Sequence, residues 1–177
     1  MSIEYEVRIL EVDDKALIER LEKLGAKHIG NFEQKRYVFD TVPTVESKWI
    51  RLRTNGKTST LTYKSVEKAT IDGTQEIEVE VSDFEKTREL LEACGIKHRG
   101  YQENRRNQYI LDDVEIDIDS WPMIPTYVEI EGKDEQSVMK MVDKLELDKS
   151  KLTALDVMSV YDQIYHIDMN KIKHLKF

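Results

Sequence analysis

Charged residues alternate with apolar residues in several short segments of this sequence. In residues 3–9, IEYEVRI, the side chains of Glu4, Glu6 and Arg8 fall on one face of a strand and the apolar side chains on the other. One such face alone is usually solvated. Here the pattern recurs with long ionic side chains, which are acidic at Glu4, Glu6, Glu76, Glu78, Asp117, Glu129 and Glu131 and basic at Arg8, Arg51, Arg53, Lys64 and Arg106. The set therefore favours one shared site over separate surface patches.

The two kinds of charge suit two kinds of ligand. Guanidinium and ammonium groups bind phosphate oxygens. Paired carboxylates bind Mg²⁺ or Mn²⁺, and these cations in turn bind phosphate. Burying many ions costs several kcal/mol per ion unless partners or solvent compensate. If these faces point inward, they must therefore line a wet interior that is built for a highly charged ligand.

The elements that would position these residues can be read from spacing and turn signals. Helical periodicity predicts helices over residues 13–25, 82–95, 134–147 and 153–167. Alternation and β-forming residues predict strands over 3–9, 35–41, 48–54, 59–66, 74–81, 107–112, 114–120 and 126–132. Residues 54–57 and 111–115 have the composition of tight turns. Eight strands joined mostly by short turns favour an antiparallel, closed or nearly closed sheet with helices outside and the charged faces inside.

The chain also repeats itself. GAKHIGNFEQKRYVFD (25–40) resembles GIKHRGYQENRRNQYILD (95–112), and each copy follows a helix that itself follows an alternating strand. Helix-termination chemistry explains the repeated glycines but not the matched strands around them. No linker rich in Gly, Pro or Ser separates the copies. We therefore expect one pseudo-twofold α+β domain over residues 1–177.

Composition excludes several classes of function. The 177-residue chain has a net charge of −8, which argues against non-specific nucleic-acid binding. Its single cysteine, Cys94, allows no internal disulfide and no cysteine-type zinc site, and it lies on an apolar helix face that favours a structural role. No segment approaches about 20 consecutive apolar residues, and no signal-peptide pattern is present. The sequence thus predicts a cytoplasmic protein with no membrane partner.

The ordered motifs resemble one known family. EYEVR is similar to the Glu-x-Glu-x-Lys signature of CYTH domains, the triphosphate tunnel metalloenzymes. The resemblance continues in order through WIRLR, LTYK, EIEVEV, RRNQY, EIDID and YVEIEG, so it covers almost the whole chain. The family includes class IV adenylate cyclases, thiamine triphosphatases and inorganic tripolyphosphatases. Its fold is an eight-stranded antiparallel barrel around a tunnel, which agrees with the strand pattern.

The resemblance implies roles for individual residues. Mg²⁺ or Mn²⁺ would be bound by Glu4, Glu6, Asp117, Glu129 and Glu131. The triphosphate would be held by Arg8, Arg51, Arg53, Lys64 and Arg106, with Arg105 as an alternative to Arg106. Glu76 and Glu78 would act in catalysis by orienting basic residues or water, and the helix near Tyr161 would plug one tunnel end.

One residue departs from the family pattern. Arg8 stands where the family usually has lysine, and a guanidinium keeps the charge but cannot serve as a general base. We therefore count Arg8 in the catalytic set through charge and position rather than proton transfer.

The reaction itself stays open at this level. The resemblance favours ATP cyclisation to cyclic AMP and pyrophosphate. Hydrolysis of tripolyphosphate, a nucleoside triphosphate or thiamine triphosphate would use the same residues, and a non-catalytic polyphosphate-binding module is a third alternative. The partner is expected to be a triphosphate-bearing small molecule. The oligomeric state is not determined by the sequence, and a homodimer is one alternative because paired barrels are common in such families.

Overall fold

Strands account for most of the regular structure. The computed structural model describes residues 1–177. Its strands are β1 (Ser2–Ile9), β2 (Lys27–Asp40), β3 (Lys48–Thr54), β4 (Ser59–Val66), β5 (Thr74–Val81), β6 (His98–Leu111), β7 (Val114–Ser120), β8 (Tyr127–Gly132), β9 (Leu152–Thr153) and β10 (His174–Leu175). Its helical segments are α1 (Asp14–Lys23), α2 (Phe84–Ala93), α3 (Glu135–Lys144), η1 (Lys149–Lys151), α4 (Val157–Ser159), η2 (Val160–Ile164) and η3 (Met169–Lys171).

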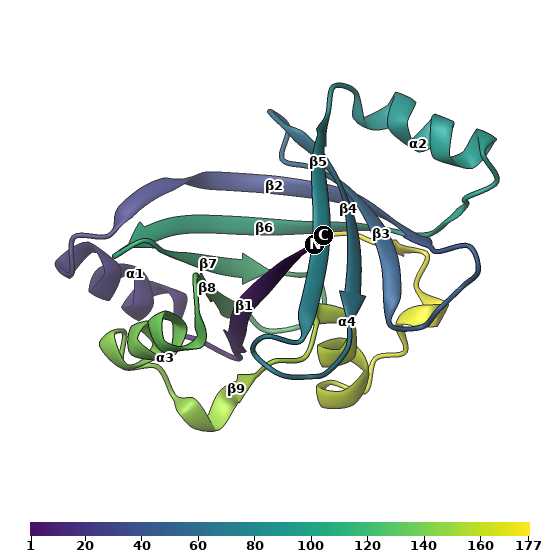
Figure 1. Ribbon diagram of the computed structural model, residues 1–177. Coiled ribbons are helices and arrows are strands. Elements are labelled where there is room, and N and C mark those ends of the chain that lie inside the picture. Colours follow the sequence, from purple (N-terminus) through teal and green to yellow (C-terminus); the bar gives the residue numbers. More distant parts are fainter.

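The eight long strands form a closed antiparallel barrel (Figure 1). Hydrogen bonding runs in the order β6-β2-β3-β4-β5-β1-β8-β7, and pairing of β7 with β6 closes the circle. The contact between β1 and β5 is short, because only Ser2, Ile3 and Glu4 are paired with β5. Further along β1, Arg8 and Ile9 pair with β9 instead of β5. The predicted α+β barrel with helices outside is thus confirmed.

Two strands are much longer than the sequence pattern indicated. β2 and β6 have 14 residues each and pair with one another over most of their length, with register shifts at His28/Gly30 and Val38/Phe39. The predicted strands over 35–41 and 107–112 cover only one end of each. The first parts were missed because a bulge and many charged residues interrupt the alternation. The tight turn at 111–115 is confirmed by positive φ angles at Asp112 (52°) and Asp113 (60°).

Helices cover one side of the barrel. α1 and α3 pack on the outer faces of β1, β7 and β8, where Leu17, Leu21, Val138 and Val142 are buried against the strand residues (Figure 1). The second copy of the repeat differs, because α2 contributes no buried residue. No helix here has the length and apolarity needed to cross a membrane.

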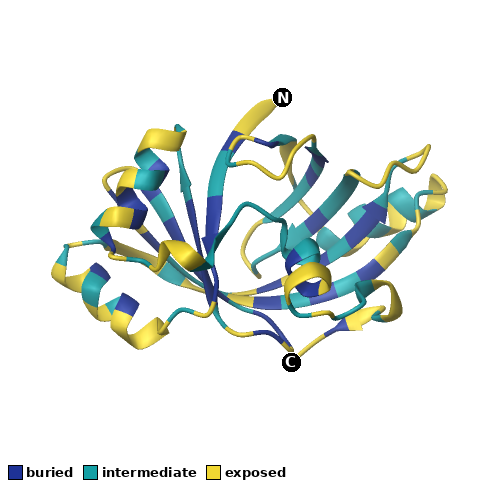
Figure 2. Cartoon of the chain, turned by 90° about the horizontal axis from the view of Figure 1, so that it is seen from below, coloured by how far each residue is buried: buried dark blue, intermediate teal, exposed yellow.

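The outer face of β5 remains open. Ile77 and Val79 on this face are 51% and 53% exposed. Figure 2 shows the unequal distribution of exposed residues over the barrel. The expectation that helices cover the apolar outer faces is therefore right for only one side of the barrel.

The segment predicted as a helix over 153–167 is broken into short pieces. The Asp156 side chain accepts hydrogen bonds from the backbone N–H groups of Met158 and Ser159, so helical structure begins only at α4. A five-residue π-helix, η2, follows directly. Its Tyr161 is fully buried against Trp121 and donates a 2.5 Å hydrogen bond to the carbonyl oxygen of Pro122. These contacts fix the segment across one end of the barrel.

Candidate active site in the barrel interior

A cavity of about 600 Å³ occupies the barrel interior and opens beside the C-terminal segment. Its wall contains nearly all of the sequence-predicted site residues, namely Glu4, Glu6, Arg8, Arg51, Arg53, Lys64, Glu76, Glu78, Arg106, Glu129 and Glu131. Asp117 is buried in a contact with Arg106. Val157, Met158, Ser159, Asp162 and Gln163 line the end where a plug was expected. Alternation along each strand thus does place the charged faces inward.

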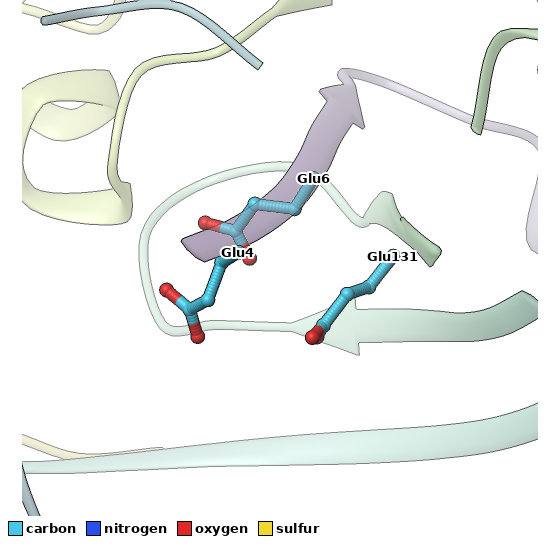
Figure 3. Close-up of side chains that lie close together, drawn as sticks. All are labelled: Glu4, Glu6 and Glu131. Carbon is cyan, nitrogen blue, oxygen red and sulfur yellow. The ribbon is translucent and has the colours of Figure 1, made fainter. Parts of the chain in front are cut away.

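Three carboxylates gather at one point of the wall. Glu4 and Glu6 project from β1 and Glu131 projects from β8, and Figure 3 shows their carboxylates turned toward one another. One oxygen of each lies within 4.8 Å of the other two. Glu131 forms no ion pair, and burial together with repulsion from Glu129 and Glu6 raises its pKa to about 8. Within this cluster Glu131 is the one carboxylate without a cationic partner, since Glu4 contacts Lys64 and Glu6 contacts Arg8.

The other two predicted metal ligands are occupied by arginines. Glu129 lies 2.5 Å from Arg8 and 3.2 Å from Arg106. Burial would raise the pKa of Glu129, but the two guanidinium groups hold it well below its usual value. Asp117 contacts Arg106, and Asp119 binds the same guanidinium at 2.7 Å. The predicted set of five carboxylates therefore divides into the cluster of Glu4, Glu6 and Glu131 and a pair, Asp117 and Glu129, that contacts Arg106.

Lys64 joins strands that are not neighbours. Its ammonium nitrogen lies 2.7 Å from both carboxylate oxygens of Glu4 and 3.3 Å from Glu76. Lys64 is on β4 and Glu4 is on β1, so this contact reaches past the intervening strand β5. Burial raises the pKa of Glu4 although Lys64 opposes the shift. Glu4 therefore belongs to the carboxylate cluster and contacts Lys64 at the same time.

Arginines dominate the opposite side of the cavity. Arg51 lies 3.4 Å from Glu78, and the Thr62 hydroxyl holds that carboxylate with a 2.6 Å hydrogen bond. Arg53 forms no ion pair. Repulsion from Arg51, burial and Arg106 lower the pKa of Arg53 to about 10. This side of the cavity is consequently short of negative charge.

Arg8 is fixed on three sides. Its Nη2 lies 3.0 Å from Glu6 and 2.5 Å from Glu129, and its Nη1 donates a 2.9 Å hydrogen bond to the carbonyl oxygen of Leu155. Burial would lower the pKa of Arg8, but Glu129 and Glu6 raise it well above the usual value. Arg8 therefore stays charged and cannot take up a proton.

Sequence reasoning placed one residue wrongly and missed another. Arg105 lies outside the barrel, where its guanidinium covers the Phe177 ring at 4.2 Å and approaches Glu33 at 3.7 Å, so it cannot replace Arg106 in the cavity. Arg36 was not predicted, yet it lines the cavity beside Arg53, its register partner. Arg36 lies within the predicted strand over 35–41, on the face opposite Tyr37 and Phe39, so the alternation of that strand could have revealed it. Asp119 was noted only as part of an alternating strand.

The cluster of Glu4, Glu6 and Glu131 fits a divalent metal. Its donors are all oxygens, and Glu131 has no competing partner, which suits Mg²⁺ or Mn²⁺. Glu4, Glu6 and Glu131 would hold the cation. A bound cation would neutralise phosphate charge and polarise a phosphoryl oxygen.

Comparisons with known proteins identify relatives with a similar sequence or fold. A Methanocaldococcus jannaschii protein named "putative adenylate cyclase" is 30% identical over 134 residues, which is 73% of this chain and 76% of that protein. A Pyrococcus horikoshii structure is 26% identical, with a TM-score of 0.75 over 87% of this chain and 96% of that one. A Hippeastrum structure has a TM-score of 0.61 at 16% identity, covers 92% of this chain and 96% of that one, and shares the fold.

The family match covers most of the molecule. The CYTH domain matches residues 2–157, which include all eight barrel strands and the charged residues that these strands place in the cavity wall. Members of this family act on triphosphates and depend on metal. The chain therefore belongs to the CYTH domain family.

Proposed function

We propose that this protein is a divalent-metal-dependent enzyme whose triphosphate substrate lies across the barrel interior. The observation that carries the proposal is the separation of an acidic cluster and a basic side within one cavity. Glu4, Glu6 and Glu131 lie together on one side, and Arg53 lies without a carboxylate partner on the other. A metal–triphosphate complex supplies a cation to the first side and phosphate oxygens to the second.

The remaining charged residues can be given roles in this proposal. Arg51, Arg53, Lys64 and Arg106 bind phosphate oxygens, while Glu76 and Glu78 orient Lys64 and Arg51 through the ion pairs described above. Arg8 stabilises negative charge from a fixed position. The rate enhancement then comes mainly from positioning and electrostatic stabilisation.

For the reaction, we favour cyclisation of ATP. The ribose 3′-oxygen attacks the α-phosphorus, its proton is lost, and pyrophosphate leaves with the electron pair of the broken P–O bond. The name of the Methanocaldococcus relative supports this choice. So does the cavity lining, because Val38, Trp49, Met158 and Met169 offer apolar surface that an inorganic polyphosphate would not use.

Hydrolysis is the second candidate. The Hippeastrum protein is described as a putative adenylyl cyclase with a dominant triphosphatase activity. A protein with this fold can therefore be named for cyclisation and yet mainly catalyse hydrolysis. In hydrolysis, water attacks the terminal phosphorus, the P–O bond to the next phosphate breaks, the diphosphate part of the substrate leaves, and orthophosphate is released together with the proton of water.

One experiment separates these reactions. The protein is incubated with Mg²⁺ or Mn²⁺ and, separately, with ATP, tripolyphosphate and thiamine triphosphate, and cyclic AMP, phosphate and pyrophosphate are measured together. Cyclisation yields cyclic AMP and pyrophosphate in equal amounts from ATP alone. Phosphate release without cyclic AMP would establish hydrolysis instead. Binding of tripolyphosphate without any product would identify a non-catalytic module.

A further inference from the structure

Arg36 has no carboxylate partner although it is only 6% exposed. Among the other buried cations of the cavity, Arg8 and Lys64 each contact two carboxylates and Arg106 contacts three. No ion pair involves Arg36. A buried, unpaired guanidinium is costly, because desolvation is not offset by an opposite charge.

Neutral groups hold Arg36 in place. Its Nη2 donates hydrogen bonds to Oε1 of Gln34, at 3.0 Å, and to Oδ1 of Asn104. Its guanidinium lies over the Trp121 ring, with 4.6 Å between the central carbon and the ring centroid. Nε of Arg36 and Nε1 of Trp121 are both buried donors without an acceptor. The side chain is thus oriented firmly while part of its donor capacity is unused.

The surroundings of Arg36 are positively charged. Arg53 is its register partner across β2 and β3, and both side chains line the cavity. Burial and repulsion from Arg51, Arg53 and Arg106 keep the pKa of Arg36 well below its usual value. These contacts destabilise the charge in the free protein, so structural stability alone gives no reason for an arginine at this position.

We propose that Arg36 binds a phosphate group of the substrate and, with Arg53, forms an anion subsite that is separate from the metal. The inference rests on the proposed function and deepens it. β2 and β1 are four strands apart in the closed eight-stranded order, so Arg36 faces the carboxylate cluster from across the barrel. A phosphate at Arg36 is therefore neutralised by guanidinium groups rather than by the cation at Glu4, Glu6 and Glu131.

A purely structural role for Arg36 makes the opposite predictions. If Arg36 served mainly to pack Trp121, its loss would lower the melting temperature and leave phosphate binding intact. If it is an anion ligand, removing its charge relieves repulsion in the free protein and weakens binding of the anion.

The test uses Arg36→Gln and Arg36→Lys, with tripolyphosphate as the probe. Affinity is measured by calorimetry without metal, and melting temperature is measured with and without tripolyphosphate. Arg105→Gln is the matched control, because it removes one arginine charge from the outside of the barrel. We expect Arg36→Gln to weaken tripolyphosphate binding roughly 10- to 100-fold. Arg36→Lys should fall between the parent and Arg36→Gln, and Arg105→Gln should bind like the parent.

The melting temperatures complete the test. Without ligand, Arg36→Gln should melt at or above the temperature of the parent, and tripolyphosphate should raise its melting temperature less. A lower melting temperature with unchanged affinity would overturn the inference and leave Arg36 a packing residue. If the parent binds tripolyphosphate and Arg53→Ala weakens that binding while Arg36→Gln does not, only this inference fails. If the parent binds tripolyphosphate neither without metal nor in the presence of Mg²⁺ or Mn²⁺, the proposed function fails with it.

Discussion

The acidic and basic sides of the cavity differ in how their charges are balanced. On β1, β7 and β8, most carboxylates are paired with cations that the protein itself supplies, and Glu131 is the clear exception. On β2 and β3, Arg36 and Arg53 have no carboxylate, and Arg51 has only a 3.4 Å contact to Glu78. The acidic side is therefore largely assembled before any ligand binds, whereas the basic side requires an external anion. Each prediction below removes or alters one of these two sides.

The largest effect is expected on the acidic side. Changing Glu129 and Glu131 together to alanine removes one paired and one unpaired carboxylate, and turnover should fall to the background rate because the metal site and the Arg8 contact are both lost. Product formation with and without Mn²⁺ measures this, and circular dichroism checks that the barrel is intact. Parent activity that persists in the presence of a metal chelator would contradict the metal assignment.

Removing Arg8 should also be severe. Arg8→Ala leaves Glu129 with only the longer contact to Arg106, and it deletes the cation that faces the substrate from β1. Tripolyphosphate affinity and turnover should fall together, which calorimetry and steady-state kinetics would show. An Arg8→Ala enzyme as active as the parent would mean that the first strand takes no part in the chemistry.

A basic-side variant should lose binding by a defined amount. Arg53→Ala should weaken triphosphate binding by about 1.5–3 kcal/mol, the range for charge-assisted hydrogen bonds. The affinity of the parent should fall as salt rises, and the variant should show a shallower dependence. Arg105→Ala, outside the barrel, is the control for the loss of one positive charge. Equal affinities of Arg53→Ala and the parent would remove β3 from the phosphate site.

The unpaired carboxylate predicts a pH dependence. Because burial raises the pKa of Glu131 to about 8, this carboxyl is mostly protonated at neutral pH and must lose its proton to bind a metal. Metal affinity should therefore rise between about pH 6 and pH 8.5, by at most about tenfold per pH unit for one proton. Calorimetry in buffers of different ionisation enthalpy would count the released proton. Glu131→Gln should bind metal weakly with a flatter profile, and a pH-independent parent would refute the prediction.

The smallest effect is expected when charge is kept. Arg8→Lys should retain much of the parent activity, because lysine is the usual family residue and the contacts with Glu6 and Glu129 need only a cation. The pH–rate profiles of parent and variant should coincide below about pH 9, since neither side chain acts as a base. A new limb in the lysine profile would instead show proton transfer at this position.

The fold could be predicted largely because alternation is a local property. The alternation of residue types alone predicts the strands and their inward faces, without information from distant parts of the chain, in residues 3–9, 48–54, 59–66 and 114–120. The repeat indicated that the two halves share one plan. It could not show that α1 buries Leu17 and Leu21 whereas α2 buries nothing, because burial depends on what packs above each helix.

Charge pairing could not be predicted from the sequence. Lys64 and Glu4 are 60 residues apart, and Arg106 and Glu129 are 23 apart, so their contacts depend on register and side-chain reach inside the closed barrel. The sequence therefore assigned five carboxylates to metal, whereas the structure brings three together and leaves only Glu131 without a cationic partner. Arg36 was missed for a different reason, since its neighbours on the same strand face, Gln34 and Val38, are uncharged and give no alternating charged pattern.

The short β1–β5 junction gives the barrel a seam. Only three residue pairs join β1 to β5, so these two strands should separate before the more extensively paired strands during thermal fluctuations. The contact between Lys64 and Glu4 crosses this junction. We expect a metal–triphosphate complex to bind both of these side chains. Binding would thus replace the contact between Lys64 and Glu4 with contacts to the ligand. Amide hydrogen exchange along β5 should therefore report whether the interior is occupied.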